Sequence, residues 1–346
     1  MKKIALIFGG TSAEYEVSLK SAANVLSVLE NLDIEIYKIG IASNGKWYLT
    51  FSDNETISND LWLQEKKINE ITPSFDGRGF YDQSEKAYFK PDILFPMLHG
   101  GTGENGTLQG VFECMQIPYV GCRVASSAIC MNKYLLHQFA KSVGVMSTPT
   151  QLISSTDEQQ VIKNFTELYG FPIFIKPNEA GSSKGISKVH TEAKLAQALT
   201  EAFQFSQTVI LQKAVSGIEI GCAILGNNQL LIGECDEVSL TTDFFDYTEK
   251  YQMTTAKLTV PAKIPVVTSR EIKRQAQLLY QLLGCRGLAR IDFFLTETGE
   301  ILLNEINTMP GFTNHSRFPA MMAATGITYQ ELISTLITLA EEREHA

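Results

Sequence analysis

The sequence KIALIFGGTS at residues 3–12 decides the fold of the N-terminal part. Its apolar run has the length of a buried strand, and the two glycines end that run in a turn. Apolar residues then recur at helical spacing, at Leu19, Ala22 and Leu26, and residues 34–41 supply a second strand. This strand, helix, strand order predicts an open parallel sheet, in which ligands bind beyond the carboxyl ends of the strands.

Periodicity weakens over residues 42–88, where turn residues are frequent. We expect short hairpins and surface loops there rather than a domain. Residues 92–98 read as another strand, and a short helix over 107–115 and a strand at 118–120 follow. These elements predict an α/β class and a first domain that ends near residue 122.

A second pattern lies in two strands joined by a short turn near the C-terminus. Alternation places Arg290 and Asp292 on one face of the first strand, and Glu305 and Asn307 on one face of the second. If the strands pair, three oxygen ligands converge beside an arginine, which suits Mg²⁺ that bridges nucleotide phosphates. The alternative is a hairpin with a solvated charged face.

Lys176 ends an apolar strand, and a loop with two glycines and two serines follows at residues 181–185. Backbone N–H groups and hydroxyls of such a loop can fold over phosphates, although an ordinary hairpin turn has the same composition. The loop matches neither the P-loop nor the dinucleotide-binding pattern. Lys133 and Lys250 are further candidate phosphate partners, or else solvated surface lysines.

The segment 212–219 is an apolar strand end whose backbone could pair with an adenine edge, with Glu219 as a candidate ribose acceptor. An edge strand with an exposed acid would look the same. The three preceding patterns, which are a carboxylate hairpin, a glycine and serine loop and this strand end, together suggest a nucleotide site.

Composition places the chain among soluble folded proteins. Its 346 residues include 38 acidic and 29 basic ones, and the formal net charge of -9 offers no bulk attraction to nucleic acid or anionic lipid. The first apolar run is too short for a signal peptide, and no stretch approaches the roughly 20 apolar residues of a membrane helix. The six cysteines form no CxxC pair, so we expect reduced thiols, a cytoplasmic location and no zinc site.

These patterns, in this order, resemble the ATP-grasp superfamily and, within it, the D-alanine:D-alanine ligase family. The resemblance rests on motifs along nearly the whole chain, namely FGGTSAE at 8–14, LHG at 98–100, GENGTLQG at 103–110, IKP at 175–177, GSS at 181–183 and NEINTMPG at 304–311. The nearest resemblance is to the vancomycin-resistance branch of C type, which makes D-alanyl-D-serine.

The resemblance implies a fold and its division. An N-terminal domain at 1–122 of the pre-ATP-grasp type would precede a two-part ATP-grasp fold that binds ATP between two sheets. Its central subdomain would span 123–211 and its C-terminal subdomain 212–346, with a mobile ω-loop at about 236–255 that closes over ATP and excludes water.

The resemblance also implies roles at the nucleotide. In the family, ATP phosphorylates the carboxylate of a first D-alanine, and the amine of a second amino acid attacks the acyl phosphate. Two Mg²⁺ or Mn²⁺ ions offset phosphate repulsion. The implied nucleotide ligands are Lys133, Lys176, Ser183, Gln212, Lys213, Val215, Glu219 and Lys250, and the implied metal ligands are Asp292, Glu305 and Asn307. The family often has Glu where Gln212 stands.

For the amino-acid substrates, the resemblance implies that Glu14 holds the first ammonium and that Ser182 and Tyr251 link this glutamate to the ω-loop. His99 matches a contact to the first carboxylate, although a satisfied polar histidine is the alternative. Arg290 and the N–H of Gly311 match the oxyanion site.

Specificity for the second substrate is predicted from two departures from the D-alanine pattern. Arg317 follows Ser316 where many relatives have an apolar residue, and Phe245 replaces a tyrosine of the ω-loop. An arginine near the incoming side chain can donate to the hydroxyl of D-serine, which leaves unpaired polar surface when D-alanine enters. The alternative is that Arg317 pairs with an acid and tunes nothing.

The predicted function is therefore ATP-dependent ligation of D-alanine to D-serine, by a homodimer without nucleic-acid or membrane partners. A housekeeping D-alanine:D-alanine ligase is the first alternative. A D-lactate-using ligase would usually have a histidine where Tyr251 stands. A catalytically silent nucleotide-binding protein of the same fold is the alternative from another class.

Overall fold

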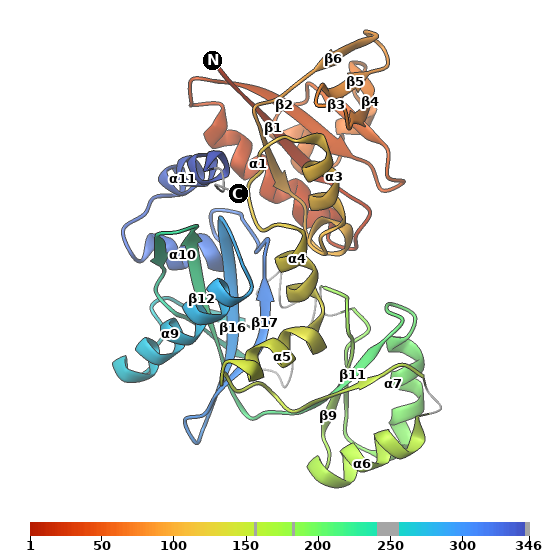
Figure 1. The fold of residues 1–346 in the computed structure, drawn as a ribbon, viewed down its shortest axis with the longest axis vertical. Helices are drawn as coiled ribbons and strands as arrows, with labels where there is room; N and C mark the ends of the chain where they lie inside the picture. The colour runs from red at the N-terminus through yellow and green to blue at the C-terminus, as the bar shows by residue number, and fades with distance from the viewer. Residues whose placement is uncertain (156–157, 182–183, 241–255, 343–346) are drawn as a thin grey trace.

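The part of the chain that the structure describes folds into three β-sheets with helices packed against them, which confirms the α/β class (Figure 1). The computed structural model describes residues 1–155, 158–181, 184–240 and 256–342. The sheets follow one another along the chain and are called the N-terminal, central and C-terminal sheets below. In these described ranges, no helix is long and apolar enough to cross a membrane.

The N-terminal sheet has the strand order β6-β5-β4-β3-β2-β1-β7. It is parallel where β1 pairs with β2 and β7, as expected, and antiparallel from β2 outward to β6. Its strands are β1 (Lys2–Gly9), β2 (Ile34–Ile41), β3 (Trp47–Thr50), β4 (Ile68–Ser74), β5 (Gly79–Asp82), β6 (Ala87–Phe89) and β7 (Ile93–Met97). The accompanying helices are α1 (Tyr15–Leu29), α2 (Asn54–Ser58), η1 (Trp62–Gln64), η2 (Gly101–Gly103) and α3 (Thr107–Met115).

Residues 42–88 differ from the expectation of surface loops. The hairpins are present, but β3 to β6 extend the N-terminal sheet, because Leu49, Ile71 and Phe80 are buried against its core. The predicted strand at 118–120 is reduced to an isolated bridge between Leu94 and Tyr119.

The glycine turn after β1 is required by close packing. Gly9 has a φ of +88°, and a Cβ there would lie 2.2 Å from Ile41 O. The next amide, Gly10 N, donates to the same carbonyl at 2.8 Å. A side chain at Gly9 is therefore excluded, and the tight turn brings Glu14 to the start of α1.

The central sheet is antiparallel, in the order β10-β9-β11-β8. Its strands are β8 (Thr150–Ile153), β9 (Ile173–Pro177), β10 (Ser187–Val189) and β11 (Val209–Lys213). Helices α6 (Gln159–Tyr169) and α7 (Leu195–Ala202), with η3 (Glu192–Lys194), cover one face. Two helices precede the sheet in the chain, α4 (Val124–Met131) and α5 (Lys133–Ser142).

The C-terminal sheet is antiparallel, in the order β15-β14-β12-β16-β17, with β13 on β12. Its strands are β12 (Gly217–Gly226), β13 (Leu230–Ile232), β14 (Asp236–Leu240), β15 (Ala256–Thr259), β16 (Leu288–Thr296) and β17 (Ile301–Asn307). Its helices are α9 (Val266–Leu282), α10 (Arg317–Ala323) and α11 (Tyr329–Glu341). The expected ω-loop differs at its start, because residues 236–240 form β14 between two strands. Residues 241–255 lie outside the described ranges.

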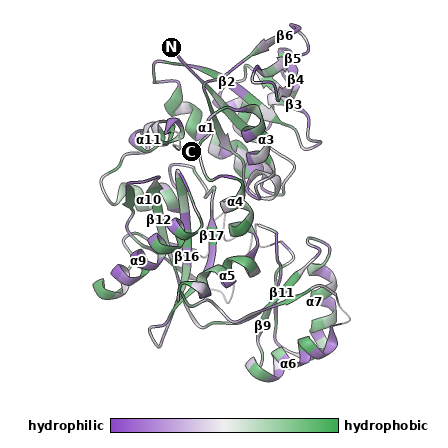
Figure 2. Cartoon of the chain, in the orientation of Figure 1, coloured by the Kyte–Doolittle hydropathy of each residue, from purple (hydrophilic) through white to green (hydrophobic). Residues whose placement is uncertain are grey.

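Three apolar cores show how the sheets are joined. The first core runs from the N-terminal sheet and α1 into α10 and α11. Helix α11 lies beside α1 in Figure 1. Another joins α4 and α5 to the C-terminal sheet and α9. A third is confined to residues 153–211 of the central sheet and its helices. Figure 2 shows alternating hydrophobic and hydrophilic segments along α6 and α9, as expected for helices with one buried face.

Candidate active site

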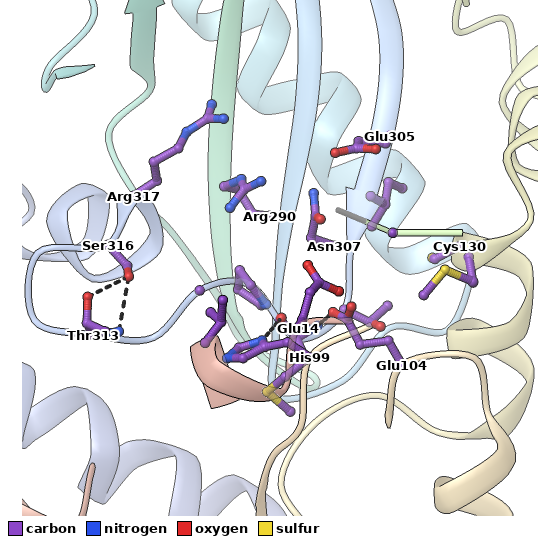
Figure 3. Close-up of a pocket in the computed structure, with 18 of the residues that line it drawn as sticks. Glu14, His99, Glu104, Cys130, Arg290, Glu305, Asn307, Thr313, Ser316 and Arg317 are labelled. Atoms are coloured by element: carbon purple, nitrogen blue, oxygen red, sulfur yellow. Dashed lines mark hydrogen bonds between the residues drawn. The ribbon is translucent and has the colours of Figure 1, made fainter. Parts of the chain in front are cut away.

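A cavity of about 360 Å³ lies where the parts of the chain meet (Figure 3). It collects nine predicted site residues, namely Glu14, His99, Lys133, Arg290, Glu305, Asn307, Gly311, Ser316 and Arg317. These residues come from the turn before α1, the end of β7, the start of α5, the hairpin β16/β17 and the 308–317 segment. Nine of the fifteen predicted site residues that the structure describes thus converge from distant parts of the sequence.

Glu14 lies at the start of α1, where its side chain is buried. A Cβ on Gly100 would lie 1.9 Å from Glu14 Oε2, and one on Gly181 would lie 3.0 Å from the same atom. Two glycines from separate loops therefore make room for this carboxylate. An anionic group in this place suits an ammonium ligand.

His99 is hydrogen-bonded through both ring nitrogens. Nδ1 lies 3.0 Å from Met309 O and Nε2 lies 2.8 Å from Ser21 Oγ. Burial lowers the pKa of His99, against the opposing charge of Glu14, so the ring is neutral. Because a carbonyl only accepts, Nδ1 carries the proton and Nε2 accepts from Ser21. These contacts are those of a satisfied polar histidine, the alternative considered from sequence, and its contact with a substrate carboxylate stays a prediction.

The expected pairing of β16 and β17 is confirmed, with Arg290 opposite Asn307 and Asp292 opposite Glu305. Arg290 donates to Asp292 from Nε at 2.8 Å and from Nη2 at 2.7 Å, and Asn307 Nδ2 donates to Asp292 Oδ2 at 2.9 Å. Although burial disfavours its charge, the neighbouring Asp292 raises the pKa of Arg290. Asp292 therefore fixes the guanidinium at the wall of the cavity.

The oxygen donors of this hairpin fit a hard cation. Two carboxylates and one amide come from facing strands, which is the donor chemistry that Mg²⁺ prefers when phosphates and water complete its shell. Among the described residues, no group of three His, Cys, Asp or Glu side chains is placed to hold a metal. The predicted set contains two such side chains, so its third ligand has to be Asn307.

Arg317 opens α10 and is buried among carboxylates. It donates to Asp236 from Nε at 2.7 Å and from Nη2 at 2.8 Å, and Nη1 donates to Glu219. Asp292 Oδ1 lies 3.5 Å from Nη2. Burial alone would raise the pKa of Asp236, but the Arg317 guanidinium outweighs burial and lowers it. The ion pair that the sequence allowed as an alternative is present, in a side chain that also lines the cavity.

Lys133 donates from Nζ to Ala180 O at 2.7 Å. Lys176 and Gln212 are buried in the central sheet on the face opposite to the one covered by α6 and α7, since Ile175 and Leu211 point into that core. Lys213 follows Gln212 on β11 and therefore lies on the opposite face of the sheet. Together with Val215 it lines a separate cavity of about 660 Å³. Among the described nucleotide ligands that the sequence predicted, Lys133 lines the first cavity, whereas Lys213 and Val215 line the second.

Five predicted residues belong to the parts of the chain that the structure does not describe, namely Ser182, Ser183, Phe245, Lys250 and Tyr251. Ser316 is within the cavity wall, where its Oγ lies 2.8 Å from Thr313 Oγ1 and accepts from Thr313 N at 3.0 Å.

The sequence did not point to three residues of the site. Glu104 accepts from Gly100 N at 2.7 Å and from Met309 N at 3.1 Å, which ties the N-terminal part to the 308–317 segment. Glu104 belongs to the GENG motif at 103–106, and that motif could have identified it as a site residue. Asp236 and Cys130 had no local signal, because their neighbours in space are distant in sequence.

Comparisons with known proteins agree with this arrangement. A model of the D-ala D-ala ligase N-terminus matches residues 3–122, and a model of the D-ala D-ala ligase C-terminus matches residues 139–338. The chain is 54% identical over 347 residues to the vancomycin C-type resistance protein VanC2 of Enterococcus casseliflavus, with 99% of each chain covered.

Solved structures give the same assignment. The VanG D-Ala:D-Ser ligase from Enterococcus faecalis superposes with a TM-score of 0.91 at 40% identity, covering 98% of this chain and 99% of that one. The D-alanine-D-alanine ligase from Coxiella burnetii gives a TM-score of 0.87 at 31% identity, with 98% and 93% covered. The chain belongs to the D-alanine:D-alanine ligase family, of ATP-grasp fold.

Proposed function

We propose that this protein joins D-alanine to D-serine with ATP, through a D-alanyl phosphate, and so supplies D-alanyl-D-serine for cell-wall precursors in vancomycin resistance. The observation that carries the choice of D-serine is Arg317, a cation buried in the wall of the cavity where D-alanine ligases often have an apolar residue. The similarity to C-type resistance proteins and to a D-Ala:D-Ser ligase supports the same choice.

The geometry suits the following division of labour. Glu14 would hold the ammonium of the first D-alanine, and Lys133 and Lys176 would hold phosphate oxygens. Arg290, oriented by Asp292, and the N–H of Gly311 would face the charge of the tetrahedral intermediate. Donors fixed before the reaction lower its barrier because they need no reorganisation at that moment.

Asp292, Glu305 and Asn307 would hold Mg²⁺ or Mn²⁺, which when bound neutralises charge on the transferring phosphoryl group. The chain's own contribution is to present these oxygens from facing strands and to keep Arg290 beside them. Arg317 would donate to the hydroxyl of D-serine, directly or through water, while Asp236 fixes the guanidinium plane.

The test is a competition assay. Purified protein is incubated with ATP, Mg²⁺ and equal D-alanine and D-serine, and the dipeptides are identified by mass spectrometry. A predominance of D-alanyl-D-serine is expected. Predominant D-alanyl-D-alanine would favour the housekeeping ligase instead, and an absence of both dipeptide and ADP would favour a silent nucleotide-binding protein.

We further propose a cytoplasmic homodimer that associates through the N-terminal domain. Six free cysteines, five of them buried, suit a reducing compartment. The dimer rests on family resemblance. Light scattering after size-exclusion chromatography would give twice the mass of one chain if this is right.

A further inference from the structure

The first turn of α5 is capped by a residue from the central sheet. A helix leaves its first N–H groups without partners inside the helix. Here Lys133 N donates to Asn178 O at 3.1 Å, and Tyr134 N donates to Asn178 Oδ1 at 2.9 Å. Only the next amide, Leu135 N, is met by the helix's own cap, Asn132 Oδ1, at 2.9 Å.

Asn178 follows β9 directly and is buried, with 2% of the residue exposed. The two halves of its amide point to different partners. Oδ1 accepts from α5, whereas Nδ2 donates to Thr208 Oγ1 at 3.1 Å, just before β11. One half therefore ties the central sheet to α5, and the other half acts within the central sheet.

The neighbouring residues continue this junction. Asn132 Nδ2 donates to Glu179 Oε1 at 2.6 Å, and Lys133 Nζ donates to Ala180 O at 2.7 Å. Four hydrogen bonds thus join segment 178–180 to the start of α5. Since α5 packs in the core of the C-terminal sheet, this junction connects that core, through the helix that begins with Lys133, to the strand that carries Lys176, two residues before Asn178.

We propose that Asn178 is a positioning residue for the nucleotide site, which holds Lys133 and Lys176 in register by capping α5 from the central sheet. The inference rests on the proposed function, in which these lysines hold the phosphates of ATP. Loss of the Oδ1 contact lets the central sheet shift against α5, and the two lysines no longer meet the same phosphates together.

The test uses three variants of the full-length enzyme. Asn178→Ala removes both contacts of the side chain. Asn178→Asp keeps an acceptor for Tyr134 N, with a charge that suits a helix N-terminus, and loses the Nδ2 donor. Thr208→Val removes the acceptor of Nδ2 and leaves the contact with α5 in place.

We expect Asn178→Ala to raise the KM for ATP about tenfold, the loss of roughly one buried hydrogen bond, with the KM for D-alanine changed less than threefold. Calorimetry with ADP and Mg²⁺ should show the same loss of affinity. Asn178→Asp and Thr208→Val should remain within about threefold of the wild type in both measurements. Asn178→Leu, similar in volume, replaces the alanine variant if that variant does not fold.

Equal effects of Asn178→Ala and Thr208→Val would overturn the inference, because the residue would then act only within the central sheet. An aspartate variant as weak as the alanine variant would overturn it too. If the wild type binds ADP and Asn178→Ala binds it equally well, the inference fails alone. A wild type that neither binds ADP nor releases it from ATP overturns the proposed function and this inference together.

Discussion

The N-terminal and central sheets are attached to the rest of the molecule in different ways. The N-terminal sheet shares one continuous apolar core with α10 and α11, whereas the core of the central sheet contains residues 153–211 alone. The central sheet meets α5 through hydrogen bonds such as the one between His137 Nδ1 and Thr150 Oγ1 and the one from Tyr134 N to Asn178 Oδ1. Separating two elements that share an apolar core exposes apolar surface to water, which costs much free energy. Hydrogen bonds between two elements can be replaced by hydrogen bonds to water at a smaller cost. The difference predicts that the central sheet with α6 and α7, called the central half below, unfolds separately. The N-terminal sheet and the elements that share its core, called the fixed half, should unfold as one unit.

The largest expected effect comes from matched core substitutions. Leu336→Ala on α11 should lower the free energy of unfolding by about 3 kcal/mol, as buried leucine truncations do, and shift the tryptophan fluorescence transition. Both tryptophans, Trp47 and Trp62, lie in the N-terminal part. Leu211→Ala, equally buried on β11, should leave that transition in place while ADP binding is lost at a lower temperature. Equal shifts in both variants would contradict the division.

The second prediction uses the hydrogen-bonded contact itself. His137 on α5 bonds Asn304 O and Thr150 Oγ1, each at 3.0 Å, and burial lowers its pKa to about 4, with Lys176 and Lys133 adding to the effect. The unfolded chain binds the proton more readily, so stability should rise by about 3 kcal/mol between pH 4 and pH 6.5 and be lost as pH falls through that range.

The His137→Gln variant should lose this share of the pH dependence in denaturant titrations at several pH values. His190→Gln, at an exposed position, is the matched control and should leave the profile unchanged. His99 keeps its own contribution in both variants. If the free energy of unfolding changed with pH in the same way in the wild type and in His137→Gln, protonation of His137 would not contribute to stability.

The third prediction concerns specificity in the fixed half. Arg317→Met together with Asp236→Asn removes the donor and neutralises the buried carboxylate that accepts two of its hydrogen bonds, while Glu219 loses its ion pair. The double variant should shift the product ratio roughly tenfold toward D-alanyl-D-alanine. Mass spectrometry of the competition assay measures the ratio. Arg274→Met, which breaks an exposed ion pair with Glu271, is the control. If the double variant kept the full preference for D-serine, Arg317 would not determine the choice of the second substrate.

The smallest effect is expected at the cap of α11. Thr328 and Glu331 form a reciprocal capping box at its start. Thr328→Ala should therefore cost about 1 kcal/mol, visible in the tryptophan transition because α11 completes the core of the N-terminal sheet. Thr200→Ala on α7 should leave this transition unchanged. The same shift from both variants would show that the halves unfold together.

Local patterns in the sequence were sufficient for much of the fold. The run at residues 3–12 predicted β1 and its glycine turn, and alternation predicted the facing pairs of β16 and β17. The strands within 42–88 were underestimated because their apolar residues are sparse and they pair at the outer side of the sheet.

The site was predictable where a motif is contiguous and not where partners are remote. Glu14 and residues 305–311 come from such motifs and line one cavity, while their roles stay predictions. The ion pair of Arg317 and Asp236 joins residues that are 81 positions apart, and the sequence around either residue does not indicate its partner. The cap of α5 by Asn178 likewise depends on where a separate sheet is placed.

The path of the chain through the shared core has a consequence for synthesis on the ribosome. The strand β1 (Lys2–Gly9) is made long before α11, but part of its core is supplied by Leu332, Ile333 and Leu336 of that helix. Domains ordinarily fold in the order in which they are made. Here β1 lacks part of its core until α11 has been made, so a message truncated before α11 yields a chain whose N-terminal sheet keeps an uncovered apolar face.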